Sequence, residues 1–343
     1  MKAIVIHKAL DLRIEDRPLQ TPGPGQVSIA IKRGGICGSD LHYYRHGGIG
    51  AIVLREPMVL GHEVAGEITA LGAGVTSLRI GQCVAVSPSL PCGTCEFCQR
   101  GQQNHCLDMR FYGSAMRMPH VQGAFQQHLV AQASQCHVIG EGISLEEAAM
   151  AEPFAVTLHA IIRAGALANK RVVVTGCGPI GALAIVAARA HGAREIIAVD
   201  IADFTLSLAE RLGADRIINS ATHPAELEAL KANKGTADIV IEASGNQAAL
   251  RSGLEILRPR GTLVQLGLGG DVSIPQNMVV AKELEILGSF RFHEEFALAV
   301  DLINRRKVDL SPLLTAVLPF EQAEDAFRLA GDRSRAMKVQ LAF

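Results

Sequence analysis

The sequence predicts an α/β protein of two domains, a β-rich domain followed by a doubly wound parallel sheet. The 343 residues leave room for about two domains, because a domain usually takes roughly 100–200 residues. Up to about residue 150, short apolar runs alternate with turns rich in glycine and proline, as is typical of β-rich domains. Beyond that point apolar strands alternate with helical segments, which favours a parallel sheet.

Several strands are expected in the first part, each an apolar run between turn signals. Examples are Ala3–Ile6, Gln26–Lys32, Val64–Leu71 and Cys83–Ser87. In the second run Val27, Ile29 and Ile31 occupy alternate positions, so they should share one face of the strand.

The second part predicts five strands with helices between them. The strands cover Arg171–Thr175, Glu195–Val199, Arg216–Ile218, Asp238–Glu242 and Gly261–Gly267. One helix is expected over Pro179–His191, and another from Asp203 as its N-cap to Gly213 at its C′ position. Because the strands are apolar throughout, both faces of the sheet should be covered. Roughly the last 50 residues do not continue this alternation of strands and helices. We expect them to form part of the first domain.

The amino-acid composition and the net charge exclude several classes of protein. Hydrophobic residues make up 48% of the chain and charged residues 20%, which excludes a disordered chain or a coiled coil. The 33 basic and 34 acidic residues leave a net charge of −1, so the chain has no basic field for nucleic acid. We therefore do not expect nucleic acid as a partner.

No membrane or export segment is expected. The apolar run in the first ten residues is cut by His7 and Lys8 and is too short for a signal peptide. The longest uncharged stretch, 172–188, contains four residues that would break a spanning helix: Gly176, Gly178, Pro179 and Gly181. We therefore expect a cytoplasmic protein.

Four of the eight cysteines lie within fifteen residues. They are Cys92, Cys95, Cys98 and Cys106. Four thiolates at such short gaps can surround one zinc ion and leave no open position, which is typical of a structural site. A group of buried free thiols is the alternative, but four at this spacing argue against it.

A second, open metal site is suggested by Cys37 among glycines, by the adjacent His62 and Glu63, and by Glu152 further on. A site with one thiolate, one imidazole and one or two carboxylates leaves room for water or substrate, as catalytic zinc requires. Each residue alone is more typical of a core or surface position. Since some ninety residues separate Glu63 from Glu152, spacing alone leaves this site open.

A dinucleotide-binding turn is predicted at 176–181. The sequence Gly176-Cys177-Gly178-Pro179-Ile180-Gly181 fits G-x-G-x-x-G between an expected strand and an expected helix. Its glycines allow a tight turn and a close approach of pyrophosphate to the helix N-terminus. Asp200 ends the next strand, where an acid would bind the ribose 2′-hydroxyl. No arginine follows directly, so NAD(H) is favoured, with NADP(H) as the alternative.

Taken together, these motifs resemble the zinc-dependent medium-chain dehydrogenase/reductase family, over nearly the whole chain. The segments ICGSDLHYY, GHEVAGEI, AEPFAVTLHA and GCGPIG, with the four-cysteine lobe, are similar to its polyol dehydrogenase branch. The resemblance implies a GroES-like catalytic domain at 1–150 and 290–343, with the zinc lobe at 88–110, and a Rossmann domain at 151–289. It also implies a homotetramer or homodimer.

The resemblance assigns roles to matching residues. Cys37, His62 and Glu63 match the catalytic-zinc motif, with Glu152 as a fourth, exchangeable ligand, so that two zinc ions are implied per subunit. Ser39 and His42 match the relay that carries the alcohol proton to solvent. Tyr43 and Arg291 match positions that contact the substrate.

Further segments, among them DMRFYGSAM and GSFRF, are most similar to members that interconvert L-idonate and 5-keto-D-gluconate. This implies hydride transfer between NAD(P) and the C5 position, with Arg291 binding the substrate carboxylate. The alternatives are a neutral polyol such as sorbitol or xylitol, or oxidation of L-threonine at C3. A zinc module that binds nucleic acid or protein is the non-enzymatic alternative, which the few basic residues near the lobe, Arg100 and Arg110, disfavour.

Overall fold

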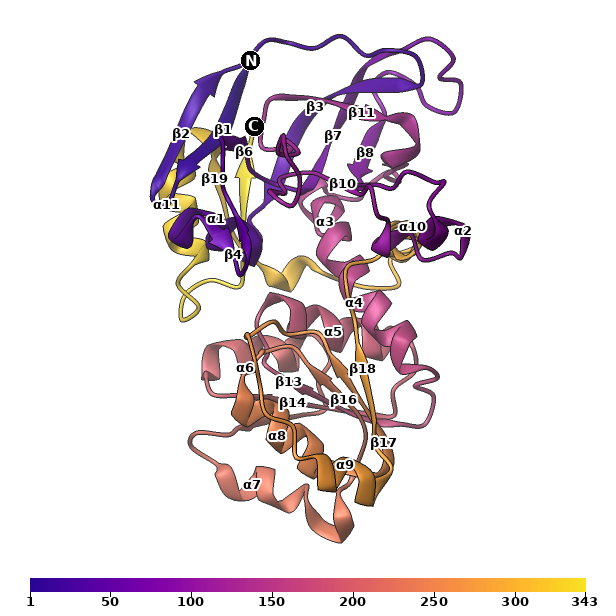
Figure 1. Ribbon diagram of the computed structural model, residues 1–343, viewed down its shortest axis with the longest axis vertical. Coiled ribbons are helices and arrows are strands. Elements are labelled where there is room, and N and C mark those ends of the chain that lie inside the picture. The colour runs from indigo at the N-terminus through magenta and orange to yellow at the C-terminus, as the bar shows by residue number, and fades with distance from the viewer.

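The apolar runs between residues 171 and 288 form a six-stranded parallel sheet in the computed structural model, which describes residues 1–343 (Figure 1). Its spatial order is β15 (Arg216–Asn219), β14 (Glu195–Asp200), β13 (Arg171–Thr175), β16 (Ala237–Glu242), β17 (Leu257–Gln265) and β18 (Glu285–Gly288). The order reverses direction at β13, which makes this a doubly wound sheet of the Rossmann type.

Helices cover both faces of this sheet, as the apolar strands predicted. In β13, Val172 and Val174 pack into one core and Val173 into another. The first core is completed by α4 (Ala151–Ala164), α5 (Pro179–Ala190), α6 (Asp203–Arg211) and α10 (Glu295–Asn304). The second is completed by α7 (Pro224–Ala229), α8 (Gln247–Ile256) and α9 (Gln276–Lys282).

The first part of the chain builds a seven-stranded sheet around β3 (Gln26–Gly35). The other strands are β7 (Glu63–Leu71), β8 (Cys83–Val86), β11 (His128–Gln132), β12 (Cys136–Val138), β19 (Leu314–Pro319) and β20 (Lys338–Ala342). Val27, Ile29 and Ile31 are fully buried on one face of β3, as their alternation predicted.

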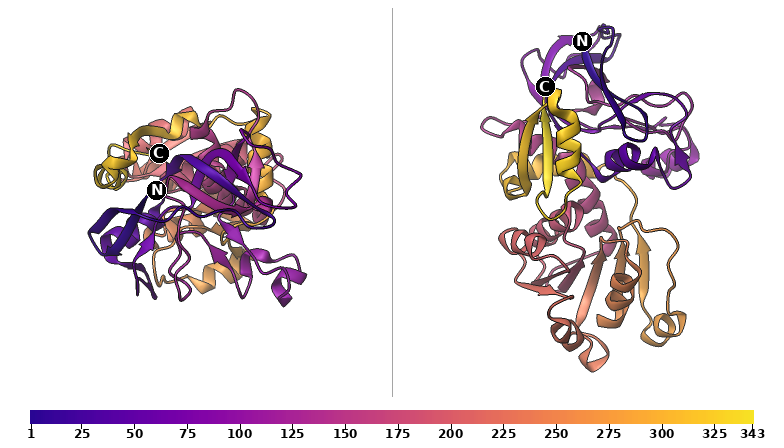
Figure 2. Two further views of the ribbon diagram at one scale, coloured as in Figure 1. Left: turned by 90° about the horizontal axis from the view of Figure 1, so that it is seen from above. Right: turned by 90° about the vertical axis from the view of Figure 1, so that its left-hand side faces the viewer.

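The end of the chain lies in this first sheet. Strand β20 runs antiparallel to β3, with Gln340 opposite Gly35, and its other edge pairs with β19. Helix α11 (Ala323–Ala330) packs beside β20, and Figure 2 shows these C-terminal elements against the N-terminal part of the molecule.

Smaller elements complete the upper body of Figure 1. A three-stranded sheet contains β1 (Lys2–Lys8), β2 (Asp11–Asp16) and β6 (Met58–Val59), and the hairpin of β4 (Gly48–Ile49) and β5 (Ile52–Val53) follows α1 (Gly38–His46). Strands β9 (Ser89–Leu90) and β10 (Arg110–Phe111) pair at the base of the cysteine lobe, which holds α2 (Glu96–Gln99). Helix α3 (Leu145–Ala149) precedes α4. None of the helices combines the length and the apolar character that a bilayer crossing needs.

Two local predictions were wrong. Asp203 is not the N-cap of α6: Ala202 occupies that position, and the Asp203 carboxylate instead accepts a hydrogen bond of 2.6 Å from the Asn219 side chain. The predicted strand 261–267 begins earlier, at Leu257, which already pairs with Ala237, and it ends at Gln265. Gly213 follows the C-cap of α6 with a φ of +109°, as predicted.

Candidate active site

Strand register brings the first metal-binding residues together. Glu63 opens β7 and pairs directly with Gly35 at the end of β3. Two residues beyond Gly35 the chain reaches Cys37, the N-cap of α1. The ligand atoms of Cys37, His62 and Glu63 consequently all lie within 4.8 Å of one another. The structure thus brings these three predicted residues together.

Two glycines make this approach possible. A Cβ atom at Gly35 would lie 2.1 Å from the Glu63 carboxylate. Gly61 has a φ of +90°, and a Cβ atom there would lie 2.1 Å from the Phe125 ring. A larger residue at either position would push the backbone that carries Glu63 or His62 away from the cluster.

Two charged residues beside the cluster were not predicted. Lys338, at the start of β20, is buried and donates a hydrogen bond of 2.7 Å to Glu63. Burial opposes the lysine charge, but the charge of Glu63 outweighs it and raises the pKa of Lys338. Asp40 is fully buried, accepts hydrogen bonds from the N–H groups of Cys37 and Gly61, and lies 3.8 Å from His62 Nδ1. Both residues hold the cluster in place.

The cluster fits a divalent cation. The buried His62 Nδ1 has no hydrogen-bond partner, although buried polar atoms normally have one. Burial raises the pKa of the Cys37 thiol to about 12, whereas a metal ion would hold it as the thiolate. Burial likewise raises the pKa of Glu152 to about 8, against the influence of His62. The charges of this cluster therefore influence the pKa of Glu152, although Glu152 is not part of the group formed by Cys37, His62 and Glu63.

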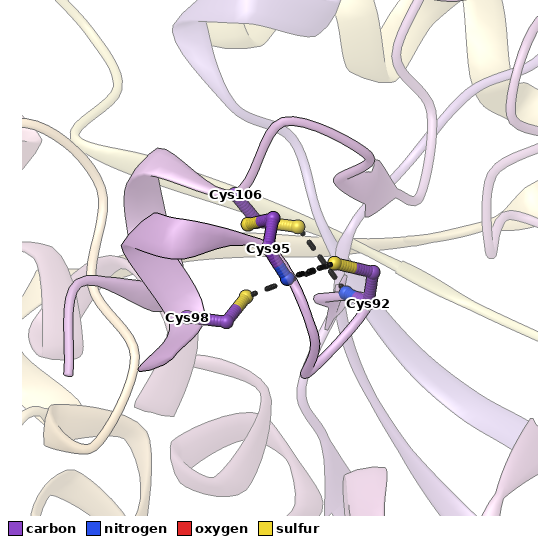
Figure 3. Close-up of side chains that lie close together, drawn as sticks. All are labelled: Cys92, Cys95, Cys98 and Cys106. Carbon is purple, nitrogen blue, oxygen red and sulfur yellow. Dashed lines mark hydrogen bonds between the residues drawn. The ribbon is translucent and has the colours of Figure 1, made fainter. Parts of the chain in front are cut away.

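The four-cysteine lobe is a second, closed cluster. Figure 3 shows its four sulfur atoms turned toward a common centre, and they lie within 4.8 Å of one another. Backbone N–H groups also point to the sulfurs: Cys95 donates to Cys92 at 3.3 Å, and Cys92 donates to Cys106 at 3.2 Å. Hydrogen bonds from Thr94 and Cys95 lower the pKa of Cys92 to about 6. Four sulfurs gathered in this way suit a structural zinc ion.

Arg291 and His62 of the open cluster both lie next to the aromatic ring of Phe111. The guanidinium carbon is 4.2 Å from the centroid of the Phe111 ring, and the His62 ring is 5.6 Å from the same ring. Burial lowers the pKa of Arg291, against the influence of Glu152 and Tyr43. The buried Tyr43 hydroxyl accepts a hydrogen bond from Ala115 N–H.

The proposed proton relay lies on α1. Ser39 and His42 are three residues apart on this helix, so they occupy one side of it. His42 is exposed, and partial desolvation together with the charge of His46 lowers its pKa.

The glycine turn has the geometry of a phosphate cradle. Gly176 has a φ of +82°, and a Cβ atom at Gly181 would lie 1.8 Å from the Gly176 carbonyl oxygen. A Cβ atom at Gly178, the N-cap of α5, would meet nothing within 4 Å. Pro179 and Ile180 then form the first helical positions. The open space at Gly178 lets a ligand approach the helix N-terminus.

Unpartnered polar atoms mark the carboxyl ends of three strands. The buried side-chain oxygens of Thr175, Gln265 and Ser289, at or just beyond the ends of β13, β17 and β18, have no hydrogen-bond partner. Ligands of doubly wound sheets bind at this edge. These residues were missed by sequence analysis, where only their position at strand ends could have identified them.

Comparisons with known proteins agree with this geometry. Residues 23–141 match the alcohol dehydrogenase GroES-like domain, and residues 179–305 match the zinc-binding dehydrogenase family. The chain is 43% identical over 316 residues to L-idonate 5-dehydrogenase (NAD(P)(+)) of Escherichia coli strain K12, covering 92% of this chain and 91% of that protein. It is 40% identical over 330 residues to D-xylulose reductase A of Aspergillus oryzae, covering 94% of this chain and 90% of the relative.

The same fold is seen in a crystal structure. That structure, of L-idonate 5-dehydrogenase from E. coli K-12 MG1655, has a TM-score of 0.96 and 40% sequence identity, and the match covers 100% of this chain and 98% of the other. On these likenesses and its two metal-binding clusters, the chain belongs to the zinc-dependent medium-chain dehydrogenase/reductase family, in its polyol dehydrogenase branch.

Proposed function

We propose that the chain is a zinc-dependent oxidoreductase that transfers a hydride between NAD(P) and the C5 position of L-idonate or 5-keto-D-gluconate. The observation that carries this proposal is the position of Arg291, whose guanidinium lies next to the same Phe111 ring as His62 of the open cluster. A substrate held at the cluster by one oxygen could thus offer a carboxylate to a fixed cation. The 43% identity to L-idonate 5-dehydrogenase supports the same substrate.

In this proposal residues 151–289 bind the cofactor, and residues 1–150 and 290–343 form the catalytic domain. The N-terminus of α5 at Gly178 would receive the pyrophosphate. Asp200, at the end of β14, would accept hydrogen bonds from the ribose hydroxyls, which favours NAD(H) over NADP(H). A nicotinamide cofactor held by these residues would supply the hydride chemistry of the reaction.

Cys37 and His62 would hold the catalytic zinc, with Glu63 and Glu152 as the acidic ligands. Zinc at this position acts as a Lewis acid on the substrate oxygen. Lys338 orients the Glu63 carboxylate, and Asp40 holds the backbone of Cys37 and Gly61. The four cysteines of the lobe would hold the structural zinc.

Ser39 and His42 would move the alcohol proton. Ser39 borders the cluster, next but one to Cys37, and its hydroxyl forms a hydrogen bond with that thiol. His42 is exposed on the same helix, so it can pass a proton to bulk water. Tyr43 would donate a hydrogen bond to a substrate hydroxyl.

A neutral polyol is the second candidate substrate. The 40% identity to D-xylulose reductase A favours it. In this case Arg291 would donate hydrogen bonds to hydroxyl groups in place of a carboxylate.

A substrate panel separates the two candidates. The panel contains 5-keto-D-gluconate, D-xylulose and D-fructose, each with NADH and with NADPH, before and after removal of zinc by a chelator. We expect the highest kcat/KM with 5-keto-D-gluconate and NADH, and loss of turnover on chelation. Higher kcat/KM with the neutral ketoses would favour the polyol candidate, and turnover insensitive to chelation would contradict both.

A further inference from the structure

The zinc lobe touches the segment that carries Arg291. This segment, residues 289–293, links β18 of the parallel sheet to α10. Asn104 Nδ2 in the lobe donates a hydrogen bond of 2.9 Å to the carbonyl oxygen of Phe290. The neighbouring His105 stacks on the Phe290 ring, with centroids 5.8 Å apart and planes inclined by 29°.

The contacted carbonyl controls the backbone of Arg291. It belongs to the peptide group that joins Phe290 to Arg291, so fixing its direction restricts the φ angle of Arg291. That angle is +53°, in the left-handed region, which non-glycine residues adopt only when their surroundings hold them there. The Asn104 hydrogen bond supplies such a constraint from outside the segment.

The guanidinium group of Arg291 is also held by residues that follow the lobe in the sequence. It lies over Phe111, 4.2 Å from the ring centroid, and one of its nitrogens is 3.0 Å from the sulfur of Met116. Phe111 belongs to β10, which follows the lobe in sequence and pairs with β9, which precedes it. The lobe and its base therefore contact Arg291 at both its backbone and its side chain.

We propose that the four-cysteine lobe sets the position of the substrate-binding arginine, with Asn104 and His105 as positioning residues that act through Phe290. This inference rests on the proposed function, because it takes Arg291 as the partner of the substrate carboxylate. The lobe is then a specificity element as well as a stabilising one.

The kinetic test uses Asn104→Ala and His105→Ala, with Gln102→Ala as the control. Gln102 lies in the same lobe, is exposed, and has no side-chain hydrogen bond. Loss of one hydrogen bond should raise the KM for 5-keto-D-gluconate by about three- to tenfold, with kcat changed by less than about twofold. KM for D-xylulose should change little, and zinc content should stay as in the parent. His105→Tyr, which keeps an aromatic ring against Phe290, should restore the parent KM.

A double mutant shows whether Asn104 acts through Arg291. If it does, Asn104→Ala adds no further increase in KM once Arg291→Ala is present. Increases that multiply, or equal changes for the keto acid and D-xylulose, would overturn the inference.

A second measurement is independent of the substrate. Hydrogen–deuterium exchange over 289–293 should rise in Asn104→Ala and remain at the parent level in Gln102→Ala, with β13 unchanged in both. Unchanged exchange over 289–293 would overturn the positioning role even if the enzyme reduces the keto acid. Raised exchange without turnover of that acid would overturn the proposed substrate and leave the positioning role standing.

Discussion

The carboxylate of Asp200 accepts a hydrogen bond of 2.6 Å from the N–H of Cys177. The residue proposed to bind the ribose thus also ties the end of β14 to the glycine turn. Its other oxygen accepts from Ile201 N–H at 2.7 Å. One side chain therefore shapes the cradle and is also the proposed acceptor for the ribose hydroxyls.

Asp200→Ala should weaken the preference for NADH. The ratio of kcat/KM for NADH to that for NADPH is expected to fall by about tenfold or more, because the ribose loses its acceptor and a 2′-phosphate loses a repelling charge. Asp215→Ala is the control, since this residue binds Arg189 and the N–H of Ile196, near the start of β14. A parent enzyme that already prefers NADPH would contradict the assignment.

Arg291→Ala should raise the KM for 5-keto-D-gluconate by about 10- to 100-fold, because hydrogen bonds between charged partners are lost. Arg291→Lys should recover only part of this loss, since an ammonium group cannot form the two-pronged contact. Arg260→Ala, which breaks an exposed ion pair with Glu283, is the control. An unchanged KM in Arg291→Ala would show that the carboxylate binds elsewhere.

The four-cysteine lobe and the open cluster that contains Cys37 should each bind one zinc ion. Cys106→Ser is expected to lose about one of two zinc equivalents and to unfold at a lower temperature, because a structural zinc contributes directly to folding. Cys37→Ser should lose the other equivalent and the activity. Cys136, buried and outside both clusters, provides the control, and Cys136→Ser should keep both ions. Zinc content is measured by atomic absorption.

Lys338→Met should destabilise the protein strongly. It leaves the buried Glu63 charge without its cationic partner, and breaking a buried pair in this way costs about 3 kcal/mol in the free energy of unfolding. Lys2→Ala removes an exposed pair with Asp16 and should change this free energy by less than about 1 kcal/mol. Urea unfolding of both variants measures the difference. Equal stability of Lys338→Met and the parent would mean that Glu63 is neutralised by another group.

The contact between α4 and α10 should depend on pH. Glu295 accepts a hydrogen bond of 2.8 Å from His159. Burial would raise the pKa of Glu295, but the hydrogen bonds from His159 and from His293 N–H outweigh it and lower the pKa from 4.5 to about 2. Since the folded pKa lies below the unfolded one, this carboxylate stabilises the fold above about pH 5, and the stabilisation is lost as the pH falls toward about 2.

Glu295→Gln tests this dependence. At pH 7 it should lower the free energy of unfolding by about 2 kcal/mol, and the difference from the parent should shrink as the pH falls below 4.5. Glu283→Gln removes a charge from an exposed ion pair and serves as the control. It shows how acid changes the free energy of unfolding of the whole protein, including through any loss of zinc. A difference that stays constant down to pH 3 would contradict the lowered pKa.

Sequence patterns predicted those features whose residues lie close together in the chain. The apolar runs around Val172–Val174 identified the parallel sheet, because both of its faces are buried and every position must be apolar. The four-cysteine lobe was equally visible, since its ligands lie within one short segment. The N-cap of α6 was misplaced because Asp203 and Ala202 are adjacent, and a side-chain contact with Asn219 decided between them.

The open cluster could be predicted only in part. Cys37, His62 and Glu63 were suggested by residue type, but the register of β3 and β7 brings them together. Lys338 carried no signal, because a lysine late in the chain normally lies on the surface. Its burial follows from the pairing of β20 with β3, a contact between segments some 300 residues apart.

That pairing has a consequence for biosynthesis. Strand β20 supplies both an edge for β3 and the ammonium group beside Glu63, so the N-terminal sheet remains unfinished while the ribosome is still translating the parallel-sheet region. The sheet can therefore be completed only after the nascent chain has emerged from the ribosomal exit tunnel up to residue 342. The segment that contains β13 to β18 emerges in full well before that point.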